Sequence, residues 1–145
     1  MKALKNIFYD KELFRDSRDW GLVILRVIPS FYLFYYHGMR KIGSGVETWE
    51  WLGEAAMPVI GVSFGYVFFG FIAALSEGVF TWLVLFGFQT RLASLFIMLT
   101  MFFAGAYHLN DGESGESAFI YFTIYLTILL WGPGKFSVDN RLKII

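Results

Sequence analysis

One ionisable residue stands in the middle of a long apolar run: Glu77, within residues 74–80 (ALSEGVF). A charged side chain at the centre of a bilayer costs roughly 2.5–3.5 kcal/mol, so this carboxyl group needs a proton, a partner or a polar cavity. Counted from the predicted inner ends of their helices, Glu77 lies roughly 14 Å deep and Arg26 roughly 9 Å deep. An arginine side chain can span that difference. We therefore predict a buried Arg26–Glu77 ion pair, which either serves function or fixes the helix register.

A second group of polar residues gathers near the opposite ends of two apolar runs. His37 and His108, the two histidines of the chain, are each expected roughly 25 Å from the inner boundary. An imidazole can hydrogen-bond a quinone oxygen and exchange a proton at physiological pH. The sequence therefore suggests a quinone head-group pocket formed by these histidines and their polar neighbours: Tyr36, His37, Arg40, Lys41, Tyr107 and His108.

Other uses of the two histidines stay open. They can be interfacial side chains that bond to backbone or water. They can also ligate a haem, which is the less favoured use because equal depth does not establish that the rings face each other. The acidic loop at 110–116 could hold a cation with His108, but a solvated loop is the simpler interpretation, and we predict no metal site.

The elements that position these residues are those of an all-α membrane protein. Apolar residues make up 57% of the chain, above the 45–50% of soluble domains, and the excess lies in long runs. We predict a bundle of four transmembrane helices over about 20–38, 65–86, 92–108 and 117–131, of which the last is short for a span. A short interfacial helix is expected between the first two spans, with Trp49, Leu52, Ala56 and Ile60 on one face.

Basic residues predict an N-in, C-in topology. We expect residues 1–19 to be a cytoplasmic segment, either an amphipathic helix on the membrane surface or a frayed tail, residues 20–134 to be the transmembrane domain and residues 135–145 a cytoplasmic tail. On the outer side, only Arg40 and Lys41 are basic. Nine basic residues fall on the inner side, the bias expected of cytoplasmic segments: Lys2, Lys5, Lys11, Arg15, Arg18, Arg91, Lys135, Arg141 and Lys143.

Composition also excludes several classes of protein. The formal net charge is zero, so the chain has no basic face for nucleic acid. It has no cysteine, which excludes disulfides, thiol catalysis and iron–sulfur clusters, so a redox role needs a bound cofactor or a partner subunit. Gly70, Ala74 and Gly78 recur every four residues, a pattern typical of close helix contacts and a candidate surface for a homo-oligomer.

Several short motifs, taken in order, resemble the DoxX family of small four-helix bacterial membrane proteins. The matching pieces are Arg26, His37-Gly38 with Lys41, Glu77-Gly78 with Gly87 and Arg91, Met101 with His108, and the closing segment 132–139 (GPGKFSVD). The resemblance covers about residues 20–140 and implies a multi-pass protein of the bacterial inner membrane associated with redox chemistry. It also implies that Ser137 and Asp139 cap or tether the inner end of the fourth helix, with Arg91 as a partner.

These observations lead to three hypotheses of function. The first is a quinone-linked, redox-associated membrane subunit with a polar pocket near the outer leaflet. The second is a non-catalytic scaffold or oligomerising subunit, and the third a small-solute or proton pathway through Glu77. Whether the protein is an enzyme is left open.

Overall fold

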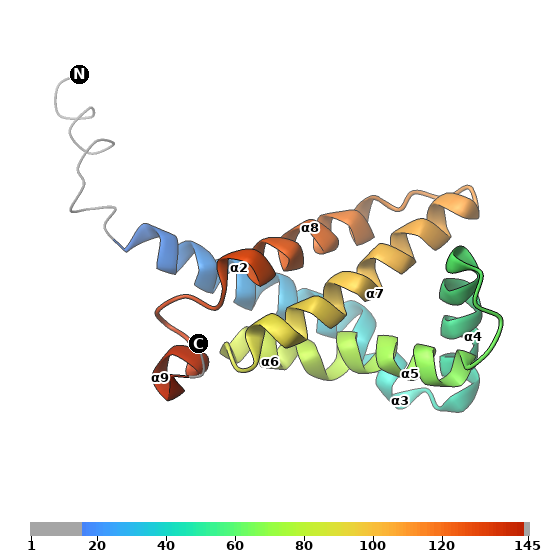
Figure 1. Ribbon diagram of the computed structural model, residues 1–145, viewed down its shortest axis with the longest axis horizontal. Coiled ribbons are helices and arrows are strands. Elements are labelled where there is room, and N and C mark those ends of the chain that lie inside the picture. The colour runs from blue at the N-terminus through green and yellow to red at the C-terminus, as the bar shows by residue number, and fades with distance from the viewer. Residues whose placement is uncertain (1–15, 144–145) are drawn as a thin grey trace, which may run out of the picture.

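The apolar runs form long helices because a segment without water must satisfy its backbone hydrogen bonds internally. The computed structural model describes residues 16–143, and all regular elements in that part are helical (Figure 1). Most of the expected amphipathic segment 1–19 therefore lies outside the described residues. The first rod is continuous and consists of α2 (Ser17–Leu33), the π-helical turn η1 (Phe34–Gly38) and α3 (Met39–Gly43).

A short helix separates the first rod from the second. It is α4 (Val46–Ala56), extended by the 3₁₀ turn η2 (Met57–Ile60) and ended by Gly61 at a positive φ of 76°. The second rod consists of α5 (Tyr66–Leu75), the π-helical turn η3 (Ser76–Phe80) and α6 (Thr81–Phe86). Then follow α7 (Thr90–Asn110), α8 (Glu116–Trp131) and the short α9 (Val138–Leu142). Figure 1 shows α3 and α4 at the opposite end of the bundle from α9.

Three of these helical segments are long and apolar enough to cross a membrane: Ser17–Gly43, Tyr66–Phe86 and Thr90–Asn110. Helix α8 is apolar but has only 16 residues. These segments support the predicted all-helical, multi-pass membrane protein. Such a protein contacts the lipid bilayer. A fourth crossing by α8 and the direction of insertion remain proposals.

The core lies where α2, α6, α7 and α8 meet. Its apolar members are buried side chains from all four helices: Leu33, Val84, Ala93, Ile97, Met101, Tyr125 and Ile128. The hydroxyl of Tyr125 is fully buried in this core and satisfies its hydrogen bond with Ser30 Oγ at 3.0 Å. A buried hydroxyl without such a partner would be costly, so this bond joins α2 to α8 at the centre of the bundle.

Glycines set the register between the two rods. A Cβ atom on Gly38 would overlap the backbone carbonyl of Glu77, and one on Gly78 would meet Ile42 at 2.9 Å. The π-helical turns η1 and η3 therefore lie against each other with Gly38 level with Gly78. Short π segments inside α-helices are frequent at functional sites.

The small-residue stripe is covered within the chain. A Cβ on Gly70 would overlap the carbonyl oxygen of Trp49, so this glycine is where α4 packs on α5. Ala74 is fully buried, and Gly78 faces α3. The stripe packs against α3 and α4 of the same chain, and it is not exposed as the oligomer surface that we considered from the sequence.

At the end of the bundle near α9, the closing segment is tied to the turn between α6 and α7. The carboxylate of Asp139 accepts hydrogen bonds from Gln89 N at 2.7 Å, from Thr90 N at 2.9 Å and from the Thr90 hydroxyl at 2.7 Å. Ser137 Oγ caps α9 by accepting from Asn140 N at 3.1 Å. Asp139 thus joins the closing segment to the start of α7, whereas the sequence had suggested the fourth helix.

Arg91 contacts the fourth helix independently of Asp139. Its Nη1 donates to the carbonyl oxygen of Leu129 at 2.8 Å, in the last turn of α8. An arginine at a helix C-terminus satisfies a carbonyl that has no partner inside the helix and interacts favourably with the helix dipole. The expected partnership of Arg91 with Ser137 or Asp139 is therefore replaced by a bond to α8.

Candidate functional site

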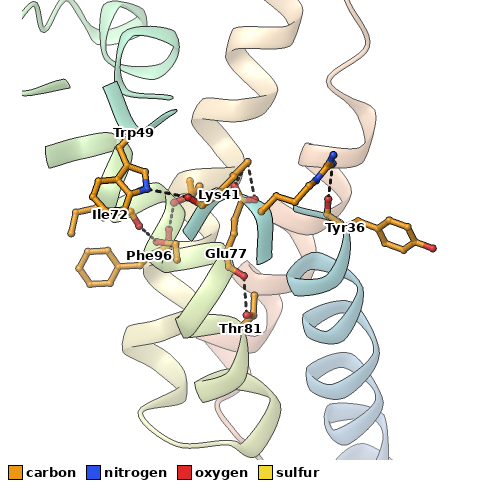
Figure 2. Close-up of polar contacts among 10 residues, drawn as sticks. Tyr36, Lys41, Trp49, Ile72, Glu77, Thr81 and Phe96 are labelled. Atoms are coloured by element: carbon orange, nitrogen blue, oxygen red, sulfur yellow. Dashed lines mark hydrogen bonds and ion pairs between the residues drawn. The ribbon is translucent and has the colours of Figure 1, made fainter. Parts of the chain in front are cut away.

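The buried carboxylate of Glu77 has a cationic partner from α3. Lys41 Nζ donates to both carboxylate oxygens of Glu77, at 2.7 and 2.8 Å. The Glu77 side chain is 1% exposed and that of Lys41 26% exposed, so the pair is largely shielded from water. Figure 2 shows the two side chains pointing toward each other from neighbouring helical segments.

The predicted ion pair between Arg26 and Glu77 is not present in the structure, and the prediction is wrong. Gly38 is level with Gly78, and Arg26 lies three helical turns before Gly38, roughly 18 Å along the axis. Arg26 is instead level with Gly87, where a Cβ would overlap its guanidinium, and its Nη2 donates to the carbonyl of Phe136 at 2.8 Å. The sequence estimate failed because it assumed that both helices end at one depth.

The surroundings of the pair hold both residues in place. Trp49 Nε1 donates to the backbone carbonyl of Lys41 at 3.0 Å, which connects α4 to α3, and the Trp49 ring packs edge-on against Phe71. On the other side, the Thr81 hydroxyl donates to the backbone carbonyl of Glu77 at 2.9 Å (Figure 2). Satisfied hydrogen bonds of this kind fix the geometry of a buried polar group.

The Lys41–Glu77 pair lies in the wall of a cavity of about 700 Å³. The cavity lies between α4–η2 on one side and α5, η3 and α7 on the other, and its lining is mostly apolar. Its polar lining is a small set that includes four of the residues predicted for the quinone pocket. The lining includes these charged or polar side chains: His37, Lys41, Glu77, Thr100, Tyr107 and His108.

Two predicted pocket residues do not line this cavity. Tyr36 is exposed and stacks on Tyr32 with ring centroids 5.9 Å apart, and in Figure 2 it points away from Glu77. Arg40 is exposed too, and its Nη2 donates to the carbonyl of Tyr36 at 3.3 Å. Both residues are on a face of the first rod that lies away from the cavity, so neither belongs to the candidate site.

The contribution of α4 and η2 to the cavity wall was not predicted from the sequence. Leu52, Ala56 and Ile60, expected on one face of an interfacial helix, line the cavity together with Trp51 and Met57. The signal was present in their helical spacing, but it was interpreted as a membrane-surface anchor. Trp51 reaches Tyr107 of α7 in an edge-on contact with centroids 6.3 Å apart, so α4 closes one side of the cavity.

His108 has a second contact outside the cavity. Its Nδ1 lies 2.9 Å from Glu113 Oε2 in the loop between α7 and α8. Within residues 16–143, no group of three or more His, Cys, Asp or Glu side chains could hold a metal ion. The site therefore consists of an apolar cavity with one ion pair in its wall and imidazoles beside it.

Comparison with known proteins assigns the chain to a family. The family model described as DoxX matches residues 21–109, more than half of the chain, and that stretch contains all the residues that line the cavity. A search of the curated proteins and a search of the solved structures gave no match. The resemblance noted in the sequence is confirmed: the chain belongs to the DoxX family.

Proposed function

We propose that this protein is a quinone-linked membrane subunit, in which the cavity between α4–η2, α5 and α7 binds the quinone. The observation that carries the proposal is the combination of apolar walls with a buried ion pair and two histidines in one cavity of about 700 Å³. Small-molecule sites typically have volumes of about 300–1,000 Å³, apolar walls and a few placed polar groups. A quinone matches this pattern because it joins a flat polar head to an apolar chain.

The polar groups suit the head of such a ligand. The ammonium group of Lys41 has three N–H donors. Two of them bond to Glu77, which leaves one for a quinone oxygen. The histidines can donate to a quinone carbonyl or accept from a quinol hydroxyl according to their protonation. The exposed apolar side chains Phe68 and Leu99 in the lining offer the ligand chain a route toward lipid.

The remaining parts of the proposal concern the setting. We propose that α8 supplies a fourth crossing, that both termini lie in the cytoplasm, and that the membrane is the bacterial inner membrane. The basic residues of the inner side support this orientation. Electrons would be exchanged with a redox partner subunit, since the chain has no cysteine to form a thiol redox centre.

The test is quinone binding by the purified protein. Decylubiquinone should quench the tryptophan fluorescence, because Trp51 lines the cavity, and at 100 times its Kd it should stabilise the fold by about 2.7 kcal/mol. Ala104→Phe, which fills the cavity, should weaken binding at least about tenfold, or roughly 1.4 kcal/mol. Leu92→Phe, at an exposed position of the same helix outside the cavity, is the control and should bind normally. An unchanged melting temperature and no quinone in extracts of the purified protein would refute the proposal.

A proton or small-solute pathway is the second candidate. It is favoured by one observation, that buried Glu77 and partly exposed His108 line the same cavity. Proton flux into proteoliposomes that is abolished by Glu77→Gln would support it. Flux that is absent, or unaffected by this change, would remove it.

A further inference from the structure

The end of α7 is built so that one loop residue returns to the helix. Gly112 has φ of 77°, its N–H donates to the carbonyl of Leu109 at 3.3 Å, and the N–H of Glu113 donates to the carbonyl of His108 at 2.8 Å. These two bonds and the left-handed glycine form a Schellman motif, in which the residue after the glycine lies over the last helical turn. Glu113 is thereby placed beside His108 by the backbone alone.

The side chains make use of this placement. His108 Nδ1 and Glu113 Oε2 are 2.9 Å apart, where the motif more often has a hydrophobic contact. The side chains are 41% and 63% exposed, so the pair adds little to stability. Its consequence is orientation, because an ionised carboxylate can only accept and so keeps the hydrogen of a neutral imidazole on Nδ1.

His108 also lines the cavity. With Nδ1–H bonded to Glu113, the Nε2 atom of the neutral ring is an acceptor. The other titratable groups that line the cavity are His37 from η1, Lys41 from α3, Glu77 from η3 and Tyr107 from α7, and the α4–η2 wall contributes none. Among these cavity-lining groups, His108 is the one that is hydrogen-bonded to a solvent-exposed carboxylate, that of Glu113.

We propose that Glu113 is a positioning residue that makes His108 the proton acceptor for a hydroxyl-bearing head group, a quinol, in the cavity. In this step the quinol O–H bond breaks, a bond from the proton to Nε2 forms, and Glu113 stabilises the resulting imidazolium. Water at the loop then takes the proton from Nδ1, which leaves the quinol as its monoanion and a neutral ring with its hydrogen on Nε2. Exchange with water returns the ring to the Nδ1–H form that Glu113 favours. The inference rests on the proposed function for the identity of the ligand.

The test compares the two redox forms of one probe across pH. In a His37→Gln background, His108 is the one remaining histidine. We expect the Kd of decylubiquinol to rise roughly tenfold between about pH 8 and about pH 5, because protonation removes the Nε2 acceptor, while the Kd of decylubiquinone falls. Glu113→Gln should make both changes smaller, because the neutral ring is then no longer held with Nε2 as its acceptor. Asp111→Asn, an equal change of charge in the same loop, should leave both profiles in place, and His108→Gln should flatten them.

A second readout does not depend on the ligand. The ¹⁵N spectrum of the His108 ring should show the Nδ1–H tautomer in the parent and a mixture of tautomers in Glu113→Gln. Binding of both probes with flat pH profiles would overturn this inference and leave the proposed function standing. Absence of binding would overturn the proposed function, and an Nε2–H tautomer in the parent would overturn the positioning role of Glu113 whatever the ligand.

Discussion

The Lys41–Glu77 pair makes the sharpest energetic prediction. Replacing Lys41 by Met leaves a carboxylate that is 1% exposed without its cation, whereas the double change Lys41→Met with Glu77→Gln leaves no charge to compensate. Removing one partner of a buried pair is strongly destabilising, but removing both is often close to neutral. Each single change should therefore lower the free energy of unfolding more than the double change does.

The size of the effect follows from the burial of the pair. Breaking a fully buried ion pair costs about 3–5 kcal/mol. Lys41 is 26% exposed, and Glu77 can take up a proton once its partner is gone, so we expect about 2–4 kcal/mol for Lys41→Met. In a double-mutant cycle the coupling between Lys41 and Glu77 should be about 2–3 kcal/mol. The same cycle for Arg26 and Glu77 should be additive within about 0.5 kcal/mol, because Arg26 lies three turns away.

The measurement is reversible unfolding of the purified protein in mixed micelles, with the melting temperature as a second readout. All single and double variants are compared at the same detergent composition, since the lipid environment enters every free energy. A coupling near zero for Lys41 and Glu77 would refute the ion pair. A coupling above about 1 kcal/mol for Arg26 and Glu77 would refute the helix register on which the site is built.

Two further predictions concern the ends of the bundle. Asp139→Ala removes the acceptor of three hydrogen bonds from Gln89 and Thr90 and should lower the free energy of unfolding by roughly 2–4 kcal/mol, while Asp111→Ala in the exposed loop should change it by less than about 0.5 kcal/mol; equal effects would contradict the tether. The chain has no cysteine, so single cysteines report topology directly. In intact cells Ser114→Cys should react with a membrane-impermeant maleimide and Asn140→Cys should not, and the reverse pattern would contradict the N-in, C-in orientation.

The helices could be predicted from the sequence because their signal is local. Apolar runs of about 20 residues are a strong signal, and the structure has three helical segments of the length and composition needed to span a membrane. The two π-helical turns could not be predicted, since they arise where Gly38 and Gly78 let the two rods touch. Helix content is a property of each segment, but register depends on the packing between segments.

The same distinction explains the candidate site. The presence of a cation for Glu77 was predicted correctly from the cost of burying a charge, but its identity required the register, which selects Lys41 over Arg26. The placement of Glu113 on His108 could have been predicted, because a helix that ends in Asp-Gly-Glu is a recognisable Schellman sequence. The contribution of α4 to the cavity wall could not be predicted, because its apolar face fits a membrane surface equally well.

Photolabelling tests most directly whether the cavity of this DoxX protein binds a quinone, as we propose. An azido-quinone activated in native membranes should label peptides from α4, α5 and α7 that line the cavity, and labelling should be lost in Ala104→Phe and kept in Leu92→Phe. Labelling confined to the exposed aromatic face at 31–36, or labelling that Ala104→Phe leaves unchanged, would contradict the claim.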